Sequence, residues 1–348
     1  MKKYYSFLLI LCCFLFSACS TDLMVIGNYK ETMIVYGLLN QSQTKQYIRI
    51  NKAFLGEGNA MVFAKEKDSS EFINSLDVRL IRLIDRDTVI LKPDNSIPKE
   101  EGVFYSGDQT NAIYSFDFTV KHALNPNSKY SLLVTNTSTG VTATATTSLV
   151  NNFDITNPSG ASGTFLFTPK NESARFYVEW VSNRTAKMYQ LIIRLNYDDY
   201  VTVNGVKDTL TKSVDWALPA HTTAGGDREK LGDNFSTIDY LQFLGSHLST
   251  YPELDYRKAT SMHLVIVAGG EELSTFIEVN KPSTSIVQDK PIYTNIQNGY
   301  GVFSGRYYRP PYLVTIGKIT KDFDSLTCGR FTRKLKFLKE DGTIPPCF

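Results

Sequence analysis

The sequence predicts a mainly β protein, organised as tandem antiparallel β-sandwiches with one helix inserted in the second domain. Three observations support this prediction. Apolar and polar residues alternate with a period of two over many short segments, which is typical of half-buried strands. Strand-forming residues are abundant, with 20 Tyr and 21 Phe among 348 residues. Turn residues separate the alternating segments, as they do in all-β sandwiches and barrels.

The first 18 residues have the layout of a secretory signal peptide. Lys2 and Lys3 form a positive start, and an apolar run follows from Phe7 to Phe16. A helix that crosses a bilayer needs about 20 apolar residues, so this run is too short to span. We therefore expect residues 1–18 to be removed after export.

The residues that follow the apolar run resemble the lipobox of bacterial lipoproteins. Ser17 and Ala18 come directly before Cys19, although Phe16 stands where an aliphatic residue is usual. The resemblance implies cleavage before Cys19 and lipid attachment to its thiol, with residues 19–30 as a tether. The alternative is an ordinary signal peptide with a chance cysteine.

The first domain is expected to span residues 31–150. Strands are predicted over 32–40, 45–55, 76–93 and 112–120, with a turn at the Asp-Arg-Asp of 85–87. The segment 123–150 resembles a late strand pair of a fibronectin type III or immunoglobulin-like sandwich. In that resemblance Tyr130 stands at the tyrosine corner, where the phenol bonds the preceding main chain. A generic hairpin would use the same residues.

The second domain is expected to span residues 151–348, after a polar segment rich in Asn, Ser and Gly at 151–164. Asn204-Gly205 predicts a two-residue hairpin turn. The apolar run 262–270 indicates a strand buried on both faces. One helix is predicted near 236–249, because Ser236 precedes Asp239 by three residues and apolar residues then recur at helical spacing.

Two cysteines remain after the anchor, Cys328 and Cys347. An even pair in an exported chain is typical of a disulfide, here one that closes the C-terminal tail. The alternative is two free or buried thiols.

The charge balance argues against nucleic acid as a partner. The chain has 37 basic and 35 acidic residues. Residues 1–18 contain two lysines and no acid, so the chain without the signal has 35 basic and 35 acidic residues and a net charge of zero. Nucleic-acid binders usually carry a basic excess or stripe. After residue 19 the sequence contains no apolar run of membrane-spanning length.

No motif for catalysis, metal binding or a cofactor is found in the sequence. It lacks the zinc-protease, nucleophile-elbow and Cys-x-x-Cys patterns, and its four histidines are scattered. The acid pairs Asp198-Asp199 and Glu271-Glu272 are adjacent, and neighbours on a strand face opposite sides. We therefore expect no enzyme; a glycoside hydrolase, with acids from distant strands, is the less favoured alternative.

The glycine- and tyrosine-rich segment 295–312 lacks the ending and spacing of a phosphate-binding loop, so turns and strands are expected there. Tyr300, Tyr307 and Tyr308 are candidates for an aromatic surface that stacks on a sugar or contacts a protein. The competing interpretation is that they are core residues.

The lipobox opening, the strand 35–40 (VYGLLN) and the segment 268–307 resemble uncharacterised β-sandwich lipoproteins of the Bacteroidota outer membrane, a family with a domain of unknown function. The resemblance implies a lipid-anchored, non-catalytic accessory or binding component, associated with a β-barrel partner such as a TonB-dependent transporter. It assigns no catalytic residues. A surface adhesin that binds glycans or host molecules is the alternative, and whether the protein faces the periplasm or the exterior stays open.

Overall fold

The computed structural model describes residues 30–54, 60–98, 112–117, 122–158, 163–165, 175–224, 226–282, 291–309, 312–316, 324–339, 341–345 and 347. Within these ranges the chain is mainly β, as predicted from the alternation of apolar and polar residues. Cys19 and the predicted signal and tether, apart from Lys30, lie outside the described residues.

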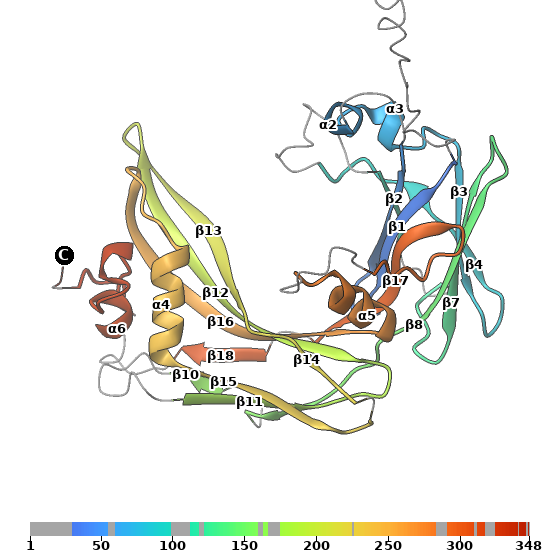
Figure 1. The fold of residues 1–348 in the computed structure, drawn as a ribbon. Coiled ribbons are helices and arrows are strands. Elements are labelled where there is room, and N and C mark those ends of the chain that lie inside the picture. Colours follow the sequence, from blue (N-terminus) through green and yellow to red (C-terminus); the bar gives the residue numbers. More distant parts are fainter. Residues whose placement is uncertain are drawn as a thin grey trace, which may run out of the picture.

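The first part of the chain builds two sheets (Figure 1). Its strands are β1 (Met33–Leu39), β2 (Lys45–Lys52), β3 (Leu76–Arg82), β4 (Thr88–Ile90), β5 (Lys92–Pro93), β6 (Ile113–Asp117), β7 (Lys129–Asn136) and β8 (Thr142–Ser148). Two short helices, α2 (Ala60–Phe63) and α3 (Lys67–Ser70), lie between β2 and β3. One sheet has the order β4-β3-β7-β8, and the other includes β1-β2-β6-β5.

These two sheets share one apolar core. Val35 of β1 and Ile48 of β2 are fully buried against Val78 of β3 and Leu132 of β7. Their positions follow the period of two, because the residues between them on each strand are more exposed. The phenol oxygen of Tyr130 accepts a hydrogen bond from the backbone N–H of Asn125 at 2.6 Å, so this tyrosine does bond the preceding main chain.

The second part is dominated by long strands. Its elements are β9 (Ile155–Asn157), β10 (Gly163–Phe165), β11 (Arg175–Val181), β12 (Met188–Val203), β13 (Val206–Ala217), β14 (His221–Thr222), β15 (Lys230–Ser236), α4 (Thr237–His247), β16 (Leu254–Gly269), α5 (Glu271–Asn280), β17 (Gly299–Tyr308), β18 (Tyr312–Ile316), α6 (Asp324–Thr327) and the 3-10 turn η2 (Arg333–Leu335).

Strand β12 lies between β13 and β16, and β15-β11-β9 forms a separate sheet. The Asn204-Gly205 turn joins β12 to β13, with positive φ at both residues, as a tight hairpin requires. Helix α4 begins at a capping box, in which Ser236 and Asp239 bond each other's backbone N–H. Its buried face packs with Trp216 and Phe235 over the second core.

Strand β17 joins the two parts. Residues Gly299–Gly305 pair in parallel with β1, and the last three residues, from Arg306 to Tyr308, pair with the end of β16. Phe303 belongs to the first core and Tyr307 to the second. A single sheet therefore runs through both parts, and a late segment of the chain completes the sheet that the first strand began.

The expectation of one helix is corrected by the structure. Besides α4, the described residues after 150 contain α5, which begins directly after β16, and the short helix α6. Glu271 and Glu272 occupy the first turn of α5, where acidic side chains stabilise the helix by interacting with the positive end of its dipole. They are therefore helical residues and do not lie on opposite faces of a strand.

Candidate binding surface

The sheet β1-β2-β17 carries tyrosines on the face that points away from the first core. Tyr36 of β1, Tyr47 of β2 and Tyr300 of β17 are 42%, 39% and 50% exposed. Tyr36 lies opposite Val302 and Arg49, and Ile34 lies opposite Tyr300, so Tyr36 and Tyr300 belong to neighbouring cross-strand rows on the same face of the sheet. Because alternate residues fill the core, the same period of two that builds the core also gathers these rings outside it.

Helix α5 covers only part of this face (Figure 1). The ring of Phe276 meets Tyr36 edge-on at 6.0 Å between centroids, and Ile277 remains exposed. The Glu272 carboxylate accepts hydrogen bonds from the hydroxyls of Ser304 at 2.9 Å and Thr147 at 3.1 Å, which fix the start of the helix on β17 and β8. None of the helix residues is fully buried, so α5 extends the surface that it borders. We call Tyr36, Tyr47, Tyr300, Phe276 and Ile277 the aromatic face.

The structure does not bring the three predicted tyrosines together. Tyr300 is exposed on the aromatic face. Tyr307 points the other way, is buried in the second core and meets Phe153 edge-on at 5.9 Å, so it cannot belong to an exposed surface. Tyr308 is half-buried beside the Arg306 guanidinium, which lies 4.7 Å from its ring centroid. Tyr308 follows Tyr300 by eight positions, or roughly 26 Å along a strand, which is too far for one small ligand.

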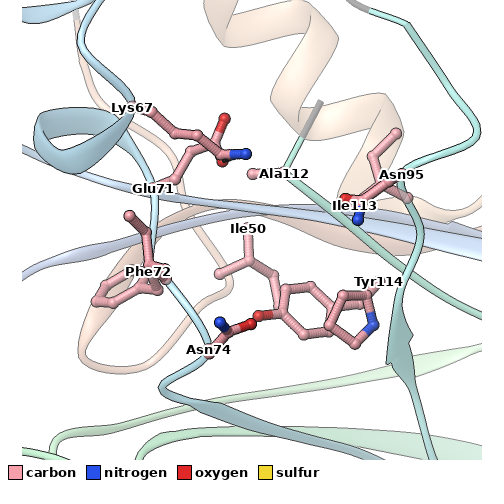
Figure 2. Close-up of a pocket in the computed structure, with 11 residues that line it drawn as sticks. Ile50, Lys67, Glu71, Phe72, Asn74, Asn95, Ala112, Ile113 and Tyr114 are labelled. Atoms are coloured by element: carbon pink, nitrogen blue, oxygen red, sulfur yellow. Dashed lines mark ion pairs between the residues drawn. The ribbon is translucent and has the colours of Figure 1, made fainter. Parts of the chain in front are cut away.

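A pocket of about 250 Å³ opens at the β6 end of the same sheet (Figure 2). Ile113, which pairs with Arg49 of β2, lies at its wall, and Ile50 and Tyr114 lie below. Lys67 and Glu71 of the α3 region form an ion pair at 3.8 Å at its rim. Burial, together with the nearby Glu71 charge, raises the pKa of Tyr114 above its ordinary value. The remaining wall is formed by Phe72, Ile73, Asn74, Pro93, Asn95 and Ala112.

Close to this pocket, a carboxylate ties β2 to β6. Asp94 bonds the Lys45 ammonium at 2.7 Å and accepts hydrogen bonds from the hydroxyls of Ser115 and Ser96. The bond from Lys45 is the largest cause that holds the pKa of Asp94 well below its usual range. The group is fully partnered, and we interpret it as a support for the sheet.

The second part contains a deeper ion pair. Asp199 of β12 and Arg257 of β16 are both buried, and the Arg257 Nε–Asp199 Oδ1 distance is 2.6 Å. Lys212 of β13 and the Tyr251 hydroxyl also bond the Asp199 carboxylate, at 3.0 Å and 2.9 Å. Burial would raise the pKa of Asp199, but the bonds from Arg257 and Lys212 outweigh it and hold that pKa below its usual range. The sequence predicted the acid pair Asp198-Asp199 but not this partner, because Arg257 lies 58 residues away.

A second pocket, of about 390 Å³, lies at the far end of the long strands. Tyr200 of β12 and Tyr256 of β16 line it and are direct cross-strand neighbours. Its other lining residues are Val201, Lys207, Asp208, Thr209, Asp255, Lys258, Leu338 and Gly342. Paired aromatic rings beside charged and hydroxyl side chains are suited to a polar ligand with one flat face.

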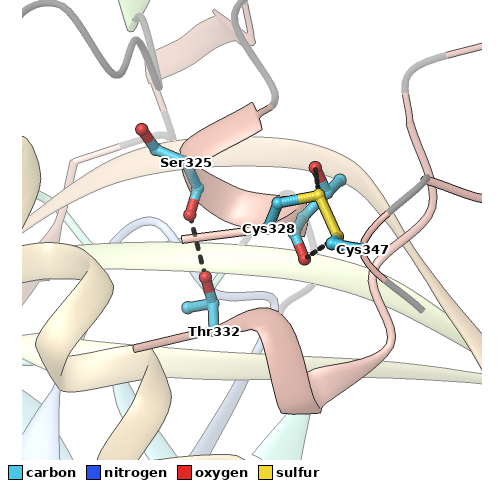
Figure 3. The surroundings of a disulfide bond; sticks show 5 residues. Ser325, Cys328, Thr332 and Cys347 are labelled. Carbon is cyan, nitrogen blue, oxygen red and sulfur yellow. Dashed lines mark hydrogen bonds between the residues drawn. A yellow bond between two sulfur atoms is a disulfide. The ribbon is translucent and has the colours of Figure 1, made fainter. Parts of the chain in front are cut away.

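The C-terminal tail reaches this end of the molecule. Phe337 forms an isolated parallel β-bridge with Arg257 of β16. Cys328 and Cys347 form a disulfide bond (Figure 3). The two cysteines are 19 residues apart, and the Thr332 hydroxyl bonds the carbonyl of Ser325 beside them. The β-bridge at Phe337 therefore holds the C-terminal tail next to the Asp199–Arg257 ion pair.

Two negative findings on the described residues bear on function. No group of three or more His, Cys, Asp or Glu side chains in the described ranges is placed to hold a metal ion. In the same part of the chain, none of the helices has both the length and the apolar character of a transmembrane helix.

Comparison with known proteins places the chain in a family but gives it no activity. Residues 21–308 match the family described as "Domain of unknown function (DUF4249)". The matched range contains the aromatic face and both long hairpin strands, and it ends before the disulfide. No curated protein matches the sequence.

Solved structures give only remote likenesses. The C-terminal globular domain of an oligosaccharyltransferase from Pyrococcus abyssi is 10% identical, with 70% of this chain and 49% of that chain covered and a TM-score of 0.20. A Salmonella alpha-2-macroglobulin variant is 9% identical, with 84% and 15% covered and a TM-score of 0.19. The chain thus spans about half or less of the length of these two proteins. Since the family match covers most of the chain, the protein belongs to the DUF4249 family.

Proposed function

We propose that this member of the DUF4249 family is a non-catalytic, lipid-anchored component of the bacterial outer membrane, which binds an envelope protein through its aromatic face. The partner we propose is a β-barrel transporter of the TonB-dependent class. The observation that carries the proposal is the gathering of Tyr36, Tyr47 and Tyr300 on one exposed sheet face, extended by Phe276 and Ile277 of α5.

Contiguous exposed aromatic surface is a physical argument for a protein partner. Isolated exposed apolar residues are normal, but a patch of them marks an interaction site. Tyrosine is enriched at protein interfaces, because its ring buries a large area while its hydroxyl keeps a hydrogen bond. Arg49, opposite Tyr36, adds a charged donor at the edge of the patch.

The anchor in this proposal is Cys19, inferred from the resemblance to a lipobox. A thioether-linked lipid would hold the tether 19–30 at the membrane, directly before β1 at Met33. Since β1 is the central strand of the aromatic face, the face would lie within a short tether length of the membrane surface.

The test is recovery of a partner from the native host. Tagged wild-type protein would be purified from gently solubilised envelopes beside Tyr36→Ser/Tyr300→Ser. Tyr177→Ser is the matched control, because Tyr177 is 57% exposed on β11 and lies outside the aromatic face. We expect a β-barrel protein with the wild type and the control, and its loss with the double variant.

A fourth sample, Cys19→Ala, distinguishes attachment to the membrane through the lipid from binding of the partner through the aromatic face. The proposal predicts that this variant leaves the membrane fraction but still binds the solubilised partner. Recovery of no protein partner by any of the samples would refute the accessory role.

A glycan-binding role is the second candidate, and the tyrosine-lined pocket at the far end of the long strands favours it. The neighbouring Tyr200 and Tyr256 rings would meet the flat face of a sugar, with Asp255 and Lys258 beside it. Binding to a glycan array that is lost in Tyr256→Ala and kept in Tyr300→Ala would support this role over the first.

A further inference from the structure

Strand β13 presents a long edge to which no described strand is paired. It runs for 12 residues, from Val206 to Ala217, and among the described strands it pairs with β12 alone. Figure 1 shows it as the outer strand of the long hairpin. Exposed strand edges of this length are templates for pairing with another chain, and proteins usually shorten, cover or charge them.

The hairpin register shows which backbone groups are free. Val203 and Val206 flank a two-residue turn, so they form a hydrogen-bonded pair, and such pairs recur at every second residue. Even-numbered residues of β13 therefore bond β12, while odd-numbered residues direct their N–H and C=O groups to the open edge. Thr209 illustrates this, because its N–H bonds the carboxylate of the neighbouring Asp208 instead of β12.

The sequence of this edge is complementary to itself. If a second copy of β13 lies antiparallel to the first and Thr211 faces Thr211, then Lys207 faces Asp215 and Thr209 faces Ser213. These are all odd-numbered residues, whose backbone groups point to the open edge, and the Thr209 N–H would exchange its bond to Asp208 for one to the second copy. Opposite charges and hydroxyl pairs are among the cross-strand combinations that stabilise antiparallel sheets.

The even-numbered residues give a mixed set of pairs, because Asp208 would face Val214 and Leu210 would face Lys212. On the other face of the strand Val206, which is 68% exposed, would lie opposite the residue Trp216, and an aromatic ring beside a β-branched side chain stabilises a sheet. Asp215 already bonds Arg194 of β12 through both carboxylate oxygens. A lysine from the second copy would therefore join an existing ion pair at the edge of the sheet.

We propose that two copies of this protein associate through antiparallel pairing of their β13 strands, centred on Thr211. Each favourable pair then occurs twice, once on each side of the twofold axis. An extended segment from an unrelated protein would meet the same backbone groups but not this side-chain complementarity, so a second copy is the occupant that the edge fits. The inference goes beyond the proposed function and does not depend on it.

Analytical ultracentrifugation of residues 20–348 carrying the native disulfide tests the proposal. The informative pair of variants is Thr211→Pro and Thr211→Val. Both lose the hydroxyl bond from Thr211 to Asp198, at 2.8 Å, but only proline removes the outward N–H. We expect a concentration-dependent dimer for the wild type and for Thr211→Val, and association weaker by roughly tenfold or more for Thr211→Pro, which loses two hydrogen bonds per dimer.

Cysteine cross-linking tests the register without proline. Hydrogen-bonded partners lie about 5.5 Å apart between Cα atoms, which suits a disulfide. Thr211→Cys should therefore form a covalent dimer under mild oxidation, and Leu210→Cys, displaced from the axis, should not. A wild type that is monomeric at all concentrations, or a dimer that survives Thr211→Pro, would overturn the proposal. Preferential cross-linking through Leu210→Cys would overturn the Thr211 register.

Discussion

The two parts of the molecule solve the same packing problem with different chemistry. In the first part, residues of two sheets contribute to one apolar core. In the second part, the long strands β12 and β16 extend beyond their covering elements, and a buried Asp199–Arg257 pair, the tail and the disulfide occupy the far end. Both parts contain a buried, partnered carboxylate, but its cation is the partly exposed Lys45 in the first part and the buried Arg257 in the second, so the second part depends on an ion pair from which water is excluded.

The two parts also share one local device. Tyr130 accepts a hydrogen bond from the Asn125 N–H, and Tyr189 accepts one from the Asn183 N–H, both at 2.6 Å. In each case the asparagine side chain caps its own turn, by bonding the N–H of the residue two places on. In both parts, this bond holds the turn against the first residues of the strand that follows it, β7 in the first part and β12 in the second.

The largest expected effect concerns the buried ion pair. Arg257→Met leaves Asp199 buried without its main partner, and breaking such a pair costs about 3–5 kcal/mol. Urea unfolding should show this loss, and Asp199→Leu/Arg257→Met should recover a large share of it, because no charge is then stranded. The Lys212 ammonium also loses its partner in that double variant, but its side chain is 38% exposed and can be hydrated. In the first part, Lys45→Met should cost clearly less, since the Lys45 side chain is partly exposed. Equal losses in Arg257→Met and Lys45→Met would remove the contrast between the two parts.

A second prediction addresses the strand that joins the parts. Gly301 has φ of +113°, and a Cβ there would lie 2.0 Å from the carbonyl oxygen of Val35 on β1. Gly301→Ala should therefore lower the free energy of unfolding by on the order of 3 kcal/mol, from strain and lost β1–β17 pairing. Gly205→Ala is the matched control, because Gly205 also has positive φ, but a Cβ added there would meet no atom within 4 Å beyond its chain neighbours. A smaller loss in Gly301→Ala than in Gly205→Ala would contradict this role for β17.

A third prediction compares the hydrogen bonds that Tyr130 and Tyr189 accept from the preceding turns. Tyr130→Phe and Tyr189→Phe each remove one hydrogen bond to a backbone N–H, and each should cost about 1 kcal/mol. Thermal unfolding of the two variants measures this. A large loss in one and none in the other would show that the two corners are alike in geometry only.

A fourth prediction, with a smaller effect, is that the free energy of unfolding decreases as the pH falls below about 4. The pKa of Asp199 is lowered in the folded state, so its contribution to stability is present above the ordinary pKa of 3.8 and is lost as pH falls below it. Chemical unfolding at pH 5 and pH 3 should show a larger drop for the wild type than for Asp199→Leu/Arg257→Met. Identical drops would assign the acid sensitivity to other groups, of which Asp94 is the first candidate.

Local patterns predicted the elements well and the long-range contacts poorly. The turn at Asn204-Gly205 and the cap at Ser236 were predicted because each depends on neighbours in sequence. Helix α5 was missed, although Leu273, Phe276 and Ile277 recur at helical spacing after two acids. No local signal tells that Gly299–Gly305 returns to β1, some 260 residues earlier, because strand pairing depends on the whole topology.

The same limit applies to the candidate site. The sequence identified Tyr300 but could not separate it from Tyr307, since both are tyrosines in one apolar strand and only the register decides which face is covered. Tyr36 and Tyr47 were placed in strands without being recognised as surface residues. The aromatic face arises only when β1, β2 and β17 are adjacent, and so it required the structure.

Site-specific photo-cross-linking in the native host shows whether the aromatic face contacts an outer-membrane β-barrel protein. A photoreactive phenylalanine analogue would replace Tyr36 or Tyr300 on the aromatic face, and Tyr177 on β11 as the control. The account predicts covalent capture of an outer-membrane β-barrel protein from positions 36 and 300 and not from 177. Capture from position 177 alone, or from none of the three, would contradict it.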